Sequence, residues 1–210
     1  MRDFVFDMDG TLYDSCTVEI DAFQGALAEA GFPVPDAETV MENVGPPFEV
    51  MIANLAQNDD PRVVAELRKV VVRWETAVIR RQATLYEGIG PMLRELKGRG
   101  AGLYICSNGN VEYLEELCKK FAFDELFDDI WRTRPGVGKP EALRILRDRN
   151  GLKDFAMIGD LNFDIEAGKA AGATTIGVTY GFSDPESVRG ADRVCRTVAE
   201  LRECLTALMA

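Results

Sequence analysis

The chain has 210 residues, which is enough for one compact domain with a modest insertion and a substantial hydrophobic core. Its 35 acidic and 24 basic side chains give a formal charge of −11, which repels nucleic acids and anionic membranes, so neither is an expected partner. The sequence contains no histidine, which excludes His-based catalytic triads and HExxH zinc sites.

The first predicted element is a short apolar strand over residues 4–6 that ends at Asp7. From about residue 15 to residue 84 no convincing strand follows, and three helical patterns are found instead. The first covers 20–27 and ends at Gly31, the second covers 48–55, and the third starts at Asp60-Pro61. The apolar face of the third is predicted to consist of Val63, Leu67, Val70, Trp74 and Val78. These helices are predicted to form an insertion after the first strand.

Beyond residue 84, apolar strands alternate with helical patterns. Strands are predicted over 102–106, 155–158 and 174–178, with weaker ones at 130–131 and near Val194. This alternation predicts an α/β fold, a three-layer Rossmann-like core in which helices cover both faces of a mainly parallel sheet. The predicted domains are an α/β core over 1–14 and 85–210 and a small α-helical domain over 15–84.

Acidic and small polar residues stand where the predicted strands end. Asp7 and Asp9 follow the first strand, Ser107 follows the second, and Asp160 follows the strand over 155–158. Ligands of parallel α/β sheets bind beyond the carboxyl ends of the strands, so we expect one shared site. Carboxylates crowded together there repel one another unless a cation separates them, and Mg²⁺ suits Asp7, Asp9 and Asp160.

Two residues further along the chain have both a functional and a structural interpretation. Lys139 precedes Pro140 and is predicted at the N-cap of a helix, where the helix dipole disfavours a cation. Such a locally unfavourable residue indicates a function, and the alternative is a solvated loop lysine. Asp164 is either a favourable first-turn acid of the helix over 162–171 or a residue that orients Lys139 or a metal-bound water.

The run Asp7-Met8-Asp9-Gly10-Thr11 resembles the first motif of the haloacid dehalogenase superfamily. Ser107, Lys139 and Gly159-Asp160 resemble its second, third and fourth motifs, in the same order and at matching spacing. The helical segment after the first motif resembles the α-helical cap of phosphoglycolate phosphatases and β-phosphoglucomutases. The resemblance extends over essentially the whole chain.

This resemblance implies a role for each matching residue. Asp7 would attack phosphorus to form an aspartyl phosphate, and Asp9 would donate and then accept the proton. Mg²⁺ would be bound by the Asp7 carboxylate, the Asp9 carbonyl and Asp160. The phosphoryl oxygens would be bound by a further set of residues, namely Gly10, Thr11, Ser107, Asn108, Gly109 and Lys139.

The loop over 43–48 lies between two helical patterns and resembles the substrate-specificity loop of helical-capped relatives. Asn43, Gly45 and Phe48 are therefore candidate specificity residues, and the alternative is a plain connector with Phe48 packed inside the helical domain. Asn43 is expected to read the leaving group.

The expected function is that of a Mg²⁺-dependent phosphatase for a small phosphorylated metabolite. A sugar phosphomutase is the alternative, although the cap histidine usual in that branch is missing, and a non-catalytic binding protein on the same fold ranks last. Five cysteines without a CxxC pair, and the lack of a leader pattern, predict a cytoplasmic protein. It is expected to be a monomer or small homo-oligomer.

Overall fold

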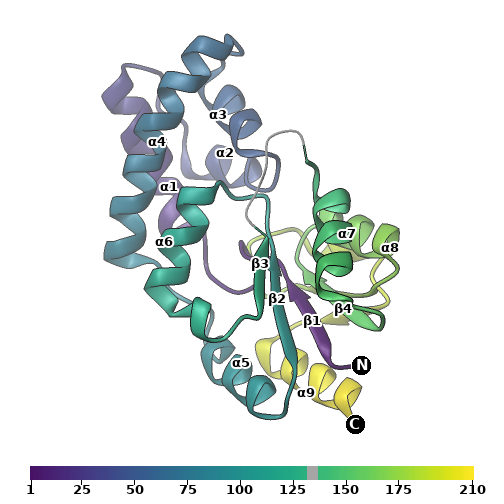
Figure 1. Ribbon diagram of the computed structural model, residues 1–210. Coiled ribbons are helices and arrows are strands. Elements are labelled where there is room, and N and C mark those ends of the chain that lie inside the picture. Colours follow the sequence, from purple (N-terminus) through teal and green to yellow (C-terminus); the bar gives the residue numbers. More distant parts are fainter. Residues whose placement is uncertain (132–136) are drawn as a thin grey trace.

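The structure is a computed structural model that describes residues 1–131 and 137–210. At its centre is a six-stranded, all-parallel sheet with strand order β3-β2-β1-β4-β5-β6 (Figure 1). The strands are β1 (Asp3–Phe6), β2 (Gly102–Cys106), β3 (Asp129–Trp131), β4 (Phe155–Gly159), β5 (Thr174–Val178) and β6 (Arg193–Cys195). The predicted α/β fold with a mainly parallel sheet is confirmed.

Helices cover both faces of this sheet. Along β1, Phe4 and Phe6 face one hydrophobic cluster and Val5 faces the other, as the alternation of side chains in a strand requires. The first cluster is closed by α5 (Ile89–Gly98), α6 (Val111–Phe121) and α9 (Val198–Met209). The second is closed by α7 (Lys139–Asn150) and α8 (Asn162–Ala171). Two 3₁₀ helices, η1 (Phe123–Glu125) and η2 (Pro185–Val188), lie in connections.

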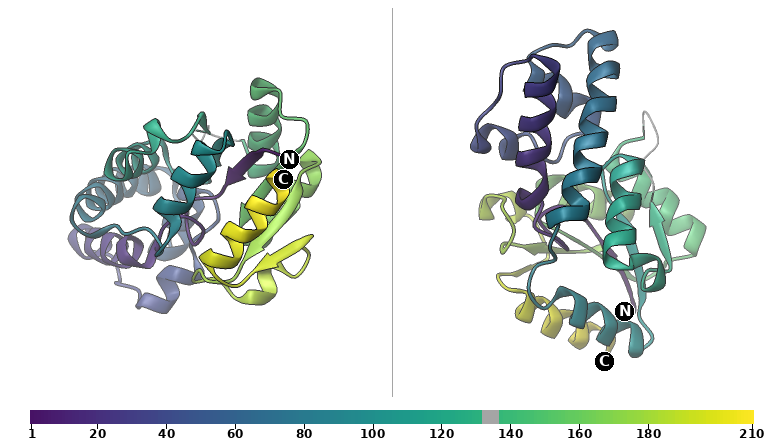
Figure 2. Two further views of the ribbon diagram at one scale, coloured as in Figure 1. Left: turned by 90° about the horizontal axis from the view of Figure 1, so that it is seen from below. Right: turned by 90° about the vertical axis from the view of Figure 1, so that its left-hand side faces the viewer.

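Four further helices form a layer beyond the carboxyl ends of the strands, as all three ribbon views show (Figures 1 and 2). This four-helix layer comprises α1 (Cys16–Ala30), α2 (Ala37–Glu42), α3 (Phe48–Ala56) and α4 (Pro61–Gln82). It has a hydrophobic cluster of its own, in which Phe23, Ile52 and Val71 are fully buried. Among the described residues, no helix is long and apolar enough to cross a membrane.

Local signals explain the ends of these helices. Gly31 ends α1 with a left-handed φ of 78°. The Asp60 side chain accepts a hydrogen bond from the amide of Arg62 at 2.8 Å and so caps α4. The short helix α2 was not predicted, and its cap is Asp36, which accepts from the amide of Thr39 at 2.8 Å.

The predicted apolar face of α4 was partly wrong. The structure buries Val64 and Val71, while Val63 and Val70 are only partly buried. The side chains at these positions are apolar on both sides of the true face, because valines stand side by side at 63–64 and 70–72. Helical periodicity alone therefore could not fix the rotation of α4 about its axis.

The four-helix layer joins the sheet through two chain segments that run side by side. Tyr13 and Leu85 form an antiparallel bridge between them. The amide of Asp14 donates to the carbonyl of Thr84 at 3.0 Å, and the amide of Tyr86 donates to the carbonyl of Leu12 at 3.3 Å. The layer is thus attached at two adjacent points on the backbone.

Candidate active site

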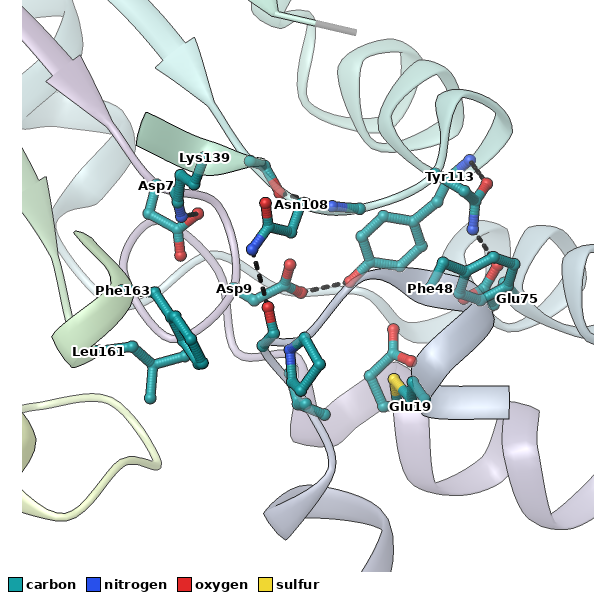
Figure 3. Close-up of a pocket in the computed structure, with 17 residues that line it drawn as sticks. Asp7, Asp9, Glu19, Phe48, Glu75, Asn108, Tyr113, Lys139, Leu161 and Phe163 are labelled. Atoms are coloured by element: carbon teal, nitrogen blue, oxygen red, sulfur yellow. Dashed lines mark hydrogen bonds and ion pairs between the residues drawn. The ribbon is translucent and has the colours of Figure 1, made fainter. Parts of the chain in front are cut away.

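The strand ends that carry polar residues meet at one cavity between the sheet and the four-helix layer (Figure 3). Asp7 follows β1, Ser107 follows β2, and α7 begins at Lys139. The sheet side of the cavity is lined by Asp7, Asp9, Ser107, Asn108, Gly109, Asn110, Tyr113, Lys139, Leu161 and Phe163. The helical side is lined by Glu19, Val44, Gly45, Pro46, Phe48, Met51 and Glu75.

Lys139 connects two buried carboxylates. Its ammonium lies 2.5 Å from Oδ1 of Asp7 and also pairs with Asp164. Burial lowers the pKa of Lys139, but the Asp164 and Asp7 carboxylates outweigh this and raise it above its usual value. Lys139 therefore stays charged, and it is the first residue of α7 rather than its N-cap, which is Gly138. The N-cap prediction was wrong by one residue because Pro140 occupies the second helical position, not the first.

Asp160 completes a group of three carboxylates with Asp7 and Asp164, whose oxygens lie within 4.8 Å of one another. Asp160 accepts hydrogen bonds from Ser183 at 2.5 Å and from Thr11 at 3.4 Å. Burial raises its pKa to about 7, and the Asp164 charge adds to this effect. The repulsion among these carboxylates is the condition under which a divalent cation binds.

Gly10 makes room for Asp160. A Cβ atom at Gly10 would lie 2.2 Å from Oδ2 of Asp160, and the backbone φ of 70° also favours glycine. Neither Gly10 nor Thr11 lines the cavity, so the structure places these two predicted phosphate-binding residues around Asp160 instead.

Asp9 lies beside the three carboxylates of Asp7, Asp160 and Asp164, but its own side chain is directed toward Tyr113. Its Oδ1 accepts a hydrogen bond from the hydroxyl of Tyr113 at 2.5 Å, and Tyr113 in turn contacts the hydroxyl of Tyr13. Burial raises the pKa of Asp9 to about 6, although the Tyr113 hydrogen bond opposes the shift. Tyr113 on α6 was not among the predicted site residues. A tyrosine at an inward-facing position of an amphipathic helix was the available signal.

The segment after β2 also reaches the cavity. Ser107 is buried, and its Oγ accepts a hydrogen bond from the amide of Gly109 at 3.0 Å. The side-chain amide of Asn108 donates to the carbonyl of Gly45 at 2.9 Å, which ties the sheet side to the helical side. The structure therefore brings Ser107, Asn108 and Gly109 to the same cavity as Asp7.

The family model of haloacid dehalogenase-like hydrolases matches residues 4–178, which include the carboxyl ends of β1 to β5. The chain belongs to this family. The predicted resemblance is thereby confirmed, as is the expected enzyme class, a hydrolase of the phosphomonoester-cleaving kind.

Several proteins resemble this hydrolase over nearly its whole length. A 5′-nucleotidase of Pseudomonas aeruginosa is 29% identical over 208 residues, 96% of this chain and 94% of the relative. The tyrosine-protein kinase PtkA of Mycobacterium tuberculosis is 25% identical, over 96% of this chain and 71% of the kinase. A phosphoglycolate phosphatase of Yersinia pestis is 24% identical, over 99% and 93%.

Solved structures agree with the fold. A haloacid dehalogenase-like hydrolase from Streptococcus pneumoniae superposes with a TM-score of 0.84 at 25% identity, over 99% of this chain and 98% of that one.

The loop over 43–48 of this hydrolase reaches the cavity with some of its residues only. Gly45 and Phe48 line the cavity, and Gly45 has a φ of 125° beside Leu161. Asn43 does not line it. Its side chain donates to the carbonyl of Thr39 at 2.9 Å and accepts from Asn54 at 3.0 Å.

Two acids on the helical side of the hydrolase were not predicted. Glu19 on α1 and Glu75 on α4 are buried and line the cavity. Glu75 stands on the buried face of α4 with Val71 and Val78, where helical periodicity calls for an apolar side chain. A charged residue at such a position was the signal in the sequence.

Proposed function

We propose that the chain is a Mg²⁺-dependent phosphatase that hydrolyses a small phosphorylated metabolite through an aspartyl phosphate on Asp7. The observation that carries this proposal is the ion pair between Asp7 and Lys139, buried at a cavity and adjacent to Asp160 and Asp164. Burial raises the pKa of Asp7, and the Lys139 ammonium opposes this by favouring the charged carboxylate, which it also holds in a fixed orientation as a nucleophile requires.

In the first step, a carboxylate oxygen of Asp7 attacks phosphorus, and the bond between phosphorus and the ester oxygen breaks. The carboxyl group of Asp9 donates its proton to the departing oxygen, so the leaving group departs as an alcohol. A pKa of about 6 allows Asp9 to exist in both protonation states near neutral pH.

In the second step, a water molecule attacks the phosphorus of the aspartyl phosphate. Asp9, now a carboxylate, accepts a proton from this water, and inorganic phosphate leaves Asp7. The hydrogen bond from Tyr113 keeps the Asp9 carboxylate oriented during both steps. Lys139 and the segment Ser107–Gly109 are positioned to contact the phosphoryl oxygens.

The residues present fit a divalent cation. Asp7, Asp160 and Asp164 offer three buried carboxylate oxygens within 4.8 Å of one another, and hard oxygen ligands are those that Mg²⁺ prefers. Asp7 and Asp160 would bind the ion, with Asp164 holding Lys139 beside them. Bound Mg²⁺ would neutralise charge on the phosphoryl group.

In this proposal the four-helix layer, with its two connections over 15–84, is a cap domain, and the remainder is the core. The cap contributes one side of the cavity and therefore contacts the leaving group. The 5′-nucleotidase and phosphoglycolate phosphatase relatives support a small phosphorylated substrate. A cytoplasmic monomer or small homo-oligomer remains our prediction.

The test is hydrolysis of an aryl phosphate with and without Mg²⁺, followed by acid quenching and mapping of the phosphorylated residue. Label on Asp7 supports the proposal, and label on another residue contradicts it. Interconversion of hexose phosphates in the presence of a bisphosphate would instead identify a phosphomutase.

A further inference from the structure

The cavity contains a second acidic group that the proposed chemistry does not use. Glu19 and Glu75 are 4% and 2% exposed and line the same cavity as Asp7. Asp9 and Tyr113 lie between these glutamates and Asp7 (Figure 3). They come from α1 and α4, so both belong to the four-helix layer.

In the described part of the chain, neutral side chains donate to these two glutamates: Tyr113 to Glu19 and Asn110 to Glu75. Oε2 of Glu75 accepts a hydrogen bond from the side chain of Asn110 at 2.9 Å. Within the described part of the chain, Oε1 of Glu19 is buried without any hydrogen-bond partner. Because an unpaired buried acceptor is costly, this oxygen points to a donor that comes from outside the chain.

Within the part of the chain that the structure describes, no free positive charge lines the cavity beside the pair. Among the described residues that line it, Lys139 is the only cation, and it is engaged by Asp7 and Asp164. Arg68 lies nearby on α4, but it is directed to Glu112 at 2.8 Å.

The pKa values reflect the same imbalance. Burial raises the pKa of Glu75 to about 8 and raises that of Glu19 well above its usual range. The Glu75 charge raises the pKa of Glu19 further. A cation placed between the two would reverse these shifts.

We propose that Glu19 and Glu75 bind a protonated amine on the leaving group, so that the substrate is the phosphate monoester of a small amino alcohol. An ammonium group has three donors and no acceptor, and it supplies the missing charge. A hydroxyl group of the same size supplies a donor but leaves the charge uncompensated. Val44, Phe48 and Met51 provide apolar surface for the carbon chain.

The size of the cavity favours a short carbon chain. Its volume is only about 40 Å³, and the phosphoryl group at the Asp7 end takes part of it, which disfavours a long leaving group. The inference rests on the proposed phosphatase, because the amine belongs to the group that Asp7 would displace from phosphorus.

The experiment compares kcat/KM for three esters of similar size: 2-aminoethyl phosphate, 2-hydroxyethyl phosphate and propyl phosphate. We expect the amine to be preferred over the hydroxyl ester by at least about tenfold in the wild type. In Glu19→Gln and Glu75→Gln the preference should fall to about twofold or less. The matched control is Glu66→Gln, which removes one charge from an exposed position of the same helix α4 and should keep the full preference.

Equal kcat/KM for the amine and hydroxyl esters in the wild type would overturn the inference, as would a preference that both cavity variants retain. In either case the two glutamates only hold the helical layer against Asn110 and Tyr113. A calorimetric titration of Asp7→Asn with the same esters separates the two proposals. Selective binding of the amine without any turnover in the wild type would contradict the phosphatase and support the amine subsite.

Discussion

The two ends of the cavity treat buried acids in opposite ways. At the Asp7 end, the carboxylates surround a buried lysine and accept hydrogen bonds from Thr11, Ser183 and the amide of Leu161. At the Glu19 end, two carboxylates face the cavity: Asn110 donates to Glu75, and among the described residues one oxygen of Glu19 has no hydrogen-bond partner. On the proposed function, the Asp7 end is organised before substrate arrives, and the Glu19 end needs a substrate group to complete it.

The largest effect is expected at the organised end. Asp7→Asn should lower turnover by about 10⁴-fold or more, because an amide is a poor nucleophile. The near-isosteric change should leave the fold intact, since Lys139 keeps its pair with Asp164. Single-turnover kinetics and a thermal unfolding curve measure the two quantities. Asp154→Asn, exposed and remote from the cavity, is the control, and substantial turnover by Asp7→Asn would remove Asp7 from the mechanism.

The second prediction concerns the cluster of three carboxylates near the strand ends. Mg²⁺ should raise the melting temperature of the wild type, because a cation relieves the repulsion among Asp7, Asp160 and Asp164. EDTA should abolish activity, and Asp160→Asn should lower it by at least about 100-fold. The same variant should lose the Mg²⁺-induced rise in melting temperature. A wild type that is fully active after exhaustive chelation would refute the metal requirement.

Tyr113, which lies between the two ends, provides a third test. In Tyr113→Phe the Asp9 carboxylate loses its donor, so the pKa of Asp9 should rise and the pH–rate profile should move to higher pH. We expect kcat to fall about tenfold. Tyr13→Phe removes only the hydroxyl that contacts the Tyr113 hydroxyl, so it should shift the pH–rate profile less. If both variants lose activity equally at every pH, Tyr113 has a packing role alone.

The fourth prediction concerns stability at the Glu19 end. Burial raises the pKa of Glu75 from 4.5 to about 8, so between these values the folded state holds a proton that the unfolded state has released. Stability therefore falls as pH rises through this range. Glu75→Gln removes the loss, and its stability relative to the wild type should grow by about 3 kcal/mol between pH 5 and pH 8.

Urea unfolding at several pH values measures this difference. Asp9, Glu19, Glu112 and Arg68 also face Glu75, and they stay unchanged in the comparison. The exposed variant Glu66→Gln should show no such trend, and a pH-independent difference for Glu75→Gln would mean that Glu75 ionises normally.

The smallest effect is expected at Asn43. Asn43→Ala should cost about 1 kcal/mol of stability through its lost contacts with Thr39 and Asn54. The ranking of substrates by kcat/KM should stay the same, whereas Phe48→Leu should change it, because Phe48 lines the cavity. A changed ranking for Asn43→Ala would restore the specificity role that the sequence suggested.

Much of the fold could be predicted because its signals are local. Short apolar runs marked the strands, and Gly31 and Asp60 marked helix ends. The group at the strand ends was also predictable in outline, since parallel strands bring Asp7 and Asp160 to one edge whatever the details of packing.

The remainder depends on contacts between segments far apart in the chain, chiefly on how the helical layer docks on the sheet. No periodicity indicates that Asn108 would meet Gly45, that Glu75 would meet Asn110, or that Ser183 would hold Asp160. The choice between Asn43 and Gly45 as the residue facing the cavity is set by the same docking. Contacts between segments far apart in the chain need three-dimensional coordinates.

The side-by-side connections through Tyr13 and Leu85 have a consequence for how such a protein can diversify. Residues 16–82 leave and re-enter the sheet-bearing part at neighbouring points, joined by backbone hydrogen bonds of Leu12 and Asp14. A helical module of different length or shape could be grafted between these points without altering the order or register of any strand. On the proposed function, mutation can therefore explore new leaving groups in one module while the residues that would cleave phosphate in the other remain unchanged.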